Sequence, residues 1–136
     1  MFYKMIENKC KEWYSSDQCT VRNLIEYIEK TGQMRDAQIE AIKVYLFLKI
    51  GCECKPLEFL FRYGCFNSIN LNDIELSTAT REYLEENPAA TALFEYSRLT
   101  NDKGEQVSEK LEKQIKKDPS SIDYSAHFAN PLHLVC

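Results

Sequence analysis

Residues 35–50, RDAQIEAIKVYLFLKI, constrain the fold more than any other stretch of this chain. The stretch begins with polar groups and then becomes apolar on nearly every face of a helix. Its apolar residues fall on two neighbouring stripes at helical spacing: Ile39, Ile42 and Leu46, and Ala41, Tyr45 and Leu48. A helix that is apolar all round is buried. The stretch therefore predicts a buried central helix, and a strand over 44–50 is the competing interpretation.

Shorter helical blocks flank this stretch and are separated by local stop signals. They are predicted at about residues 2–14, 21–31, 56–64, 77–86, 88–99, 107–117 and 121–128. Ser77 or Thr78 is predicted to cap one helix, the Asn87-Pro88 pair to begin the next as cap and first-turn proline, and Gly32 to end a helix in the left-handed conformation. We predict an all-α fold, a single domain of about six to seven short helices over 1–128, with an irregular C-terminal tail at 129–136.

The charge balance argues against a chain whose main task is to grip DNA. The sequence has 21 acidic and 17 basic residues, a net charge of −4, and its basic residues are scattered singly or in short pairs. A free-standing DNA-binding domain usually has a basic stripe or a high pI. A few phosphate contacts remain compatible with this composition.

The sequence has no stretch that is typical of a membrane span or a signal peptide. Its longest apolar patch, Val44 to Ile50, contains Lys49 and is far shorter than the roughly 20 residues that cross a bilayer. We therefore expect a cytoplasmic protein without a membrane partner.

Six cysteines are spread along the chain: Cys10, Cys19, Cys52, Cys54, Cys65 and Cys136. In a reducing compartment they are expected to be free thiols. Cys52, Cys54 and Cys65 are the candidate zinc ligands, but structural zinc sites favour paired CxxC knuckles over this CxC spacing. We therefore expect small apolar packing residues rather than a metal site. Nucleophile chemistry would need His127 or His133 beside a thiol.

No complete catalytic apparatus is visible in the sequence. It has no GxxxxGK[ST] phosphate loop, no acidic Mg²⁺-binding run, no GxSxG elbow and no HExxH. Many of its carboxylates lie beside lysine or arginine at helical spacing and are interpreted as solvated helix faces, among them Glu82, Glu85, Glu86, Glu109 and Glu112. The chain alone is expected to bind no cofactor and to catalyse no reaction.

Arg35 and Gln38 are the candidate binding residues, at the start of the predicted central helix. A glutamine amide donates and accepts hydrogen bonds together, which matches the adenine edge with its N7 acceptor beside its N6 donor. The alternative interpretation is a polar first turn ahead of a buried helix.

Several runs of this chain resemble one family. GQMRDAQIEAIKVYLFLKI with KPLEFLF, and later LSTATREYLEENPAATALFEYSRLTNDKG with SEKLEKQIKKDPSSIDY, are similar to the N-terminal region of bacterial DEAD/DEAH-box superfamily 2 helicases related to the motor subunits of type III restriction enzymes. The resemblance covers roughly Trp13 to Tyr124. By this resemblance Arg35 and Gln38 match the R-x-x-Q of the helicase glutamine motif, which contacts adenine.

The resemblance implies an accessory region in a protein of DNA restriction or phage defence. In the family, ATP and Mg²⁺ bind the helicase core, whose phosphate loop is expected soon after the position of Tyr124. The chain lacks that loop, so we expect a truncated fragment that works with a helicase core in cis or in trans and reaches DNA through the full-length protein. In typical helicases the phosphate loop follows the glutamine closely, whereas here at least some ninety residues follow Gln38 without such a loop.

The alternative function is a free-standing helical adaptor that binds a protein partner.

Overall fold

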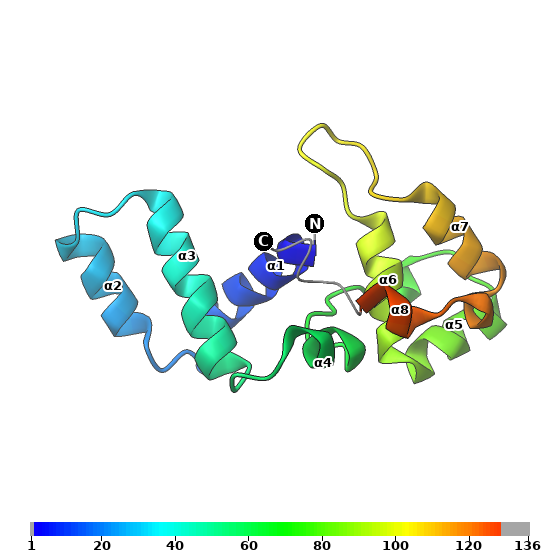
Figure 1. The fold of residues 1–136 in the computed structure, drawn as a ribbon, viewed down its shortest axis with the longest axis horizontal. Coiled ribbons are helices and arrows are strands. Elements are labelled where there is room, and N and C mark those ends of the chain that lie inside the picture. Colours follow the sequence, from blue (N-terminus) through cyan, green and yellow to red (C-terminus); the bar gives the residue numbers. More distant parts are fainter. Residues whose placement is uncertain (1, 129–136) are drawn as a thin grey trace. The chain divides into compact units, whose positions relative to one another are not determined.

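The computed structural model describes residues 2–128. Over these residues the backbone forms helices joined by turns and loops (Figure 1), and its one β pairing is an isolated antiparallel bridge between Thr100 and Gln106. The predicted all-α class is therefore confirmed for this part of the chain. None of the described helices is long and apolar enough to span a bilayer. The tail predicted at 129–136 lies outside the described residues.

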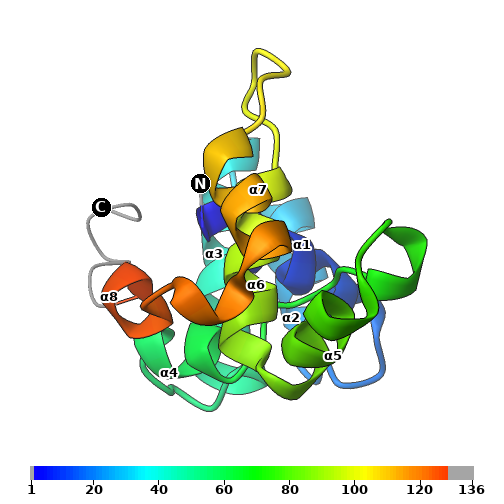
Figure 2. The same ribbon diagram turned by 90° about the vertical axis from the view of Figure 1, so that its right-hand side faces the viewer.

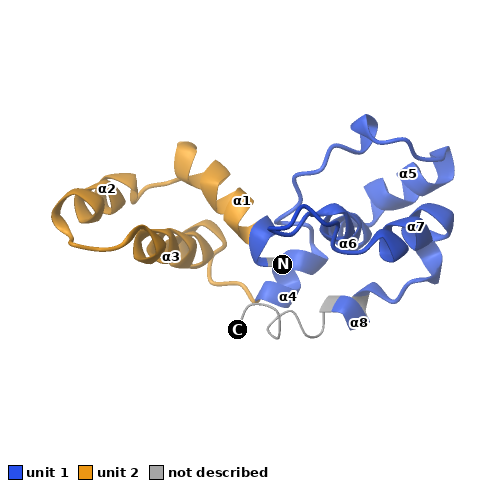
Figure 3. Ribbon diagram, turned by 90° about the horizontal axis from the view of Figure 1, so that it is seen from above, with its two compact units in different colours: residues 1–5, 57–136 blue, residues 6–56 orange. Residues whose placement is uncertain are grey.

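The chain divides into two compact units, which are coloured separately in Figure 3. Unit 1 contains residues 1–5 and 57–136, and unit 2 contains residues 6–56. The helical domain predicted over 1–128 thus comprises two compact units, and each is described by itself below.

Unit 2 consists of most of α1 (Phe2–Ser15), then α2 (Arg22–Thr31) and α3 (Asp36–Leu46), and a π-helical turn at Phe47–Gly51. Helices α2 and α3 lie side by side (Figure 1). The Trp13 ring of α1 lies 5.6 Å from the Phe47 ring, measured between centroids. A Cβ on Gly51 would come within 2.8 Å of Phe47 Cδ2 and 3.0 Å of Trp13 Nε1, so this close approach needs glycine.

The stretch 35–50 is not the buried central helix that its sequence predicts. Its α-helical part ends at Leu46, and only Ile39 and Phe47 in the stretch are buried, whereas Tyr45 is 59% exposed. Helix α3 packs through one face, which carries Ile39. The apolar residues outside that face lie at or near the surface.

Unit 1 contains α4 (Leu57–Arg62), α5 (Thr78–Glu86), α6 (Pro88–Arg98), α7 (Glu109–Lys117) and α8 (Tyr124–Phe128), with 3-10 turns at Leu71–Asp73 and Pro119–Ser121. Helix α6 is the central one, because it contacts α4, α5, α7 and α8 (Figure 2). Its buried residues fall on most of its circumference: Ala90, Thr91, Ala92, Leu93, Phe94 and Ser97.

Local capping chemistry begins the helices of unit 1. Ser77 Oγ accepts a hydrogen bond from Thr80 N, and Ser108 Oγ accepts one from Leu111 N, each at 3.2 Å. Each bond satisfies an N–H at the start of α5 or α7 that has no partner within its own helix. Pro88 opens α6, where its missing N–H costs nothing.

Candidate functional site

The two predicted binding residues lie together in the first turn of α3. Arg35 is the N-cap residue, with an extended backbone, and Gln38 is the third helical residue. The backbone N–H of Arg35 donates to Gln38 Oε1 at 2.9 Å, as in one half of a capping box. Both side chains are exposed. The structure thus gives Gln38 a defined role in the helix start, whereas its predicted contact with adenine stays a prediction.

The amide nitrogen of Gln38 is directed to no partner among the described residues. One lone pair of Oε1 is used in the cap, which leaves Nε2 with two donor hydrogens and Oε1 with a second acceptor site. A donor and an acceptor therefore remain on the surface of unit 2. Their chemistry suits the N7 and N6 edge of adenine.

A hollow of about 230 Å³ lies beside the same helix start but on another side of it. Its lining residues are Glu29, Met34, Asp36, Ile39 and Glu40. Three of the five lining side chains are carboxylates, and two of them, Glu29 and Glu40, are ion-paired with Lys43. With about 100° between successive helical residues, Gln38 points roughly 150° away from the mean direction of the three α3 residues in the lining. An adenine contact at Gln38 would therefore form on the surface and not inside this hollow.

Lys43 links the three helices of unit 2. Its Nζ lies 2.9 Å from Glu29 Oε1 of α2, 3.2 Å from Glu40 Oε1 of α3, and 4.7 Å from the centroid of the Tyr14 ring of α1. Burial alone lowers the pKa of Lys43, but hydrogen bonds to the two glutamates outweigh burial and hold the pKa above its usual value. The amine stays protonated at neutral pH and acts as a structural cation, not as a nucleophile.

The cysteines of unit 2 are mainly core residues. Cys10, Cys19 and Cys52 are buried, and Cys54 is exposed. Burial, the largest contribution, raises the pKa of the Cys10 thiol to about 11, so this thiol is a poor nucleophile. Cys65, the third candidate zinc ligand, is exposed in unit 1. Within the described part of the chain, no three potential metal ligands lie together.

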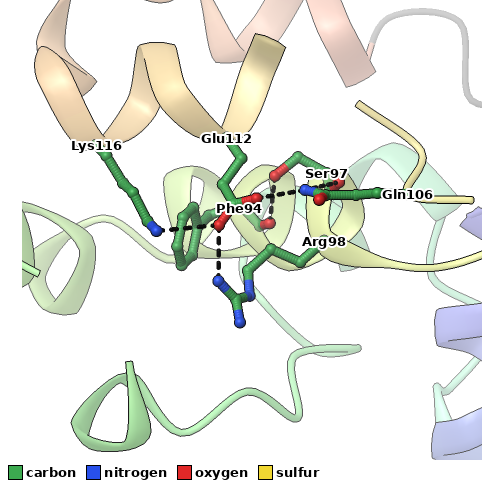
Figure 4. A network of polar contacts seen from close by, with 6 residues as sticks. All are labelled: Phe94, Ser97, Arg98, Gln106, Glu112 and Lys116. Carbon is green, nitrogen blue, oxygen red and sulfur yellow. Dashed lines mark hydrogen bonds and ion pairs between the residues drawn. The ribbon is translucent and has the colours of Figure 1, made fainter. Parts of the chain in front are cut away.

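One glutamate differs from its predicted solvated position. Glu112 of α7 has a side chain only 14% exposed, and its carboxylate accepts from Arg98 at 2.7 Å, Lys116 at 3.1 Å and Gln106 (Figure 4). Burial raises the pKa of Glu112, but the hydrogen bonds from Gln106 and Lys116 and the nearby positive charges outweigh burial and lower it. The prediction of a solvated carboxylate is therefore wrong here. The signal in the sequence was its position one residue after Leu111 and three before Ile115, on the apolar side of the helix.

This network attaches a hairpin-like loop to unit 1. Gln106 Nε2 also donates to the carbonyl oxygen of Ser97 at 3.1 Å, and Val107 N donates to Leu99 O at 2.8 Å. The base of the loop between α6 and α7 is therefore fixed by hydrogen bonds.

Comparison with models of known protein families, with curated proteins and with solved structures gives no significant match to this chain.

Proposed function

We propose that this chain is an accessory region of an ATP-dependent superfamily 2 DNA helicase, of the kind related to type III restriction motors, and that it serves DNA restriction or phage defence. On this proposal the chain does not hydrolyse ATP alone. A helicase core, joined in cis or bound in trans, supplies the phosphate loop and the Mg²⁺ ligands, and reaches DNA.

The exposed first turn of α3 is the observation that carries this proposal. The R-x-x-Q pair that resembles the helicase glutamine motif begins a helix at the surface, and the donor and acceptor that remain on Gln38 are open to a partner from outside. A glutamine buried in the core of unit 2 would have no access to a nucleotide.

The first experiment reads the genomic DNA that follows the codon for residue 136. An open reading frame with a GxGKT-type loop, in any frame, is the expected result. An unrelated gene, together with no ATPase that binds the purified chain, would contradict the proposal.

The second experiment uses the chain together with that ATPase core and measures ATP and GTP binding by calorimetry. Guanine offers two acceptors where adenine offers an acceptor and a donor, so a glutamine contact favours ATP. Gln38→Glu keeps the acceptor for Arg35 N–H but removes the amide donor for adenine N7, and Gln38→Ala removes both. We expect both variants to lose the preference for ATP. Equal preference in all three proteins would remove Gln38 from nucleotide recognition.

The second candidate function is a free-standing adaptor. Leu24 and Tyr27 of α2 are 52% and 64% exposed, and their spacing of three residues places them on neighbouring positions of one helix face. Aromatic residues such as tyrosine are enriched in the cores of protein interfaces. This function predicts a defined partner protein whose binding is weakened by Leu24→Gln and is unaffected by Gln38→Glu. The helicase proposal instead predicts that Gln38→Glu loses the preference for ATP.

A further inference from the structure

Helix α7 has two faces of different chemistry. Ile115 is fully buried and Leu111 is partly buried, while the Ser108 cap fixes the first turn. Thr80 Oγ1 of α5 donates to the carbonyl oxygen of Lys116 at 3.1 Å, and α7 also contacts α6. Figure 2 shows α7 lying over α6 with its other side open. Ser108 N also donates to Ser97 O of α6 at 3.2 Å, so contacts at both of its ends fix the orientation of α7 within unit 1.

The contacts of the Glu112 carboxylate lie on the inner side of α7. Glu112 is turned toward α6, where Arg98 and Gln106 hold its carboxylate (Figure 4). Lys116, one turn further along α7, is a third partner of this carboxylate. Glu112 also lies about 100–160° around the helix axis from Lys110, Lys113 and Lys117, so its carboxylate is not on the outer face that carries these lysines.

The outer face of α7 carries three lysines in a row. Lys110, Lys113 and Lys117 are exposed, and among the described residues none of them forms an ion pair with a carboxylate. Helical geometry places the three within about 60° of one another around the axis, and spreads them over about 10 Å along it. Gln114 lies on the same face, and the exposed Glu109 lies at its edge.

We propose that Lys110, Lys113 and Lys117 form a contact surface for the phosphate backbone of DNA. One strand of a duplex carries a phosphate about every 3.4 Å along the axis, and the three lysines, with their long side chains, can contact up to about three phosphates. Contacts of this kind position a protein on DNA without reading its sequence. The choice of DNA among polyanions rests on the proposed function, and the surface adds a direct contact from this chain to the substrate of the helicase.

The composition of the face favours a nucleic acid over a membrane. An interfacial helix places apolar side chains beside its lysines so that they enter the lipid. Here the apolar residues Leu111 and Ile115 point away from the lysine face, whose further side chain is Gln114. A polar, basic face matches a solvated phosphate backbone.

The test measures fluorescence anisotropy of a labelled duplex of about 20 base pairs, with the full chain, over a salt series. Three phosphate contacts predict a slope near −2.7 in log affinity against log salt, or about 500-fold between 20 and 200 mM. The variant Lys110→Gln/Lys113→Gln/Lys117→Gln should lose at least about tenfold affinity at low salt and most of that slope. The control Lys30→Gln/Lys49→Gln/Lys55→Gln removes the same charge from exposed positions of unit 2 and should change affinity by less than about twofold.

Three outcomes would overturn the surface: no binding by the wild type at 20 mM salt, equal losses in the two triple variants, or binding to phosphatidylserine vesicles but not to DNA. Thermal melting by circular dichroism checks that both variants fold. The measurement uses this chain without an ATPase core. Its result therefore does not depend on whether an ATPase core is found. If a core binds normally to a chain that has no affinity for DNA, the proposed DNA contact is refuted and the proposed function is not.

Discussion

At the scale of single residues, the structure separates two roles of Gln38. Its Oε1 accepts from Arg35 N–H, and an exposed cap of this kind contributes about 0.5–1 kcal/mol. We expect Gln38→Ala to lower the free energy of unfolding by this amount and Gln38→Glu to leave it nearly unchanged, because glutamate serves the same capping position. Urea unfolding followed by circular dichroism measures both. Equal losses in the two variants would show that the acceptor is not what stabilises the turn.

A second residue-scale prediction concerns Glu112 and pH. Its pKa is lower in the folded chain than in the unfolded chain, so its stabilisation is present above the unfolded value and is lost as the pH falls through the folded value. Glu112→Gln should cost about 1 kcal/mol at pH 7, a figure reduced because Arg98 and Lys116 are partly exposed. Below about pH 4.5 the difference between the two proteins should shrink toward zero, because the protonated acid resembles the amide.

The matched control for this prediction is Glu109→Gln, on the exposed first turn of the same helix. It removes the same charge without touching the network. The difference in unfolding free energy between wild type and Glu109→Gln should stay small from pH 3 to pH 7. A pH profile for Glu112→Gln that matches this control would mean that the network contributes no stability.

At the scale of elements, helix starts were predictable and helix burial was not. Ser77 and Pro88 begin helices where the sequence places them, because capping depends on a few adjacent residues. Asn87 precedes α6 as predicted, but its side chain makes no capping hydrogen bond and its Nδ2 donates to Tyr83 O. Gly32 follows α2 as predicted, but the prediction of a left-handed conformation is wrong, because its φ of −82° and ψ of 136° are those of extended backbone. The number of neighbours that surround a helix depends on tertiary packing. For this reason the apolar stretch 35–50 predicted a buried central helix, whereas the structure gives that position to α6 of unit 1.

The same limit applies to the candidate site. The position of Arg35 and Gln38 at a helix start followed from the R-x-x-Q pattern beside an apolar run. That Gln38 Oε1 accepts from Arg35 N–H could not be predicted from the sequence, because it depends on the backbone conformation of Arg35. The Glu112 network joins residues from α6, the loop and α7, and no local pattern in the sequence specifies that pairing.

Two glycines test how much a turn depends on packing. Gly64 and Gly104 both have positive φ, +71° and +78°, so alanine pays a similar backbone cost of about 1 kcal/mol at each. A Cβ at Gly64 would lie 2.7 Å from Asn67 Nδ2 and 2.9 Å from Pro88 Cβ, whereas none of the described atoms lies within 4 Å at Gly104. Gly64→Ala should therefore destabilise by about 1–2 kcal/mol more than Gly104→Ala. Chemical denaturation of the two variants provides the comparison, and equal losses would contradict the steric argument.

At the scale of the whole molecule, the exposed apolar side chains predict association in solution. The large apolar residues with the greatest exposure in unit 2 are Tyr27, Tyr45 and Leu24. A chain that normally meets a helicase core or a protein partner presents such side chains to the partner, and without the partner they favour self-contact. We expect light scattering to show a mass above that of the monomer as the concentration rises through the range of about 10–500 μM.

Substitutions on α2 locate that association. Leu24→Gln/Tyr27→Gln removes two adjacent apolar side chains without opening the core, because neither is buried. The double variant should move the onset of association to a higher concentration. Tyr63→Gln, at a residue 61% exposed on the surface of unit 1, removes one aromatic ring elsewhere and should leave the onset unchanged. Association through such a face is driven by the apolar area that the contact removes from water. A wild type that stays monomeric throughout would therefore show that the exposed apolar area of α2 is too small to hold a partner by itself.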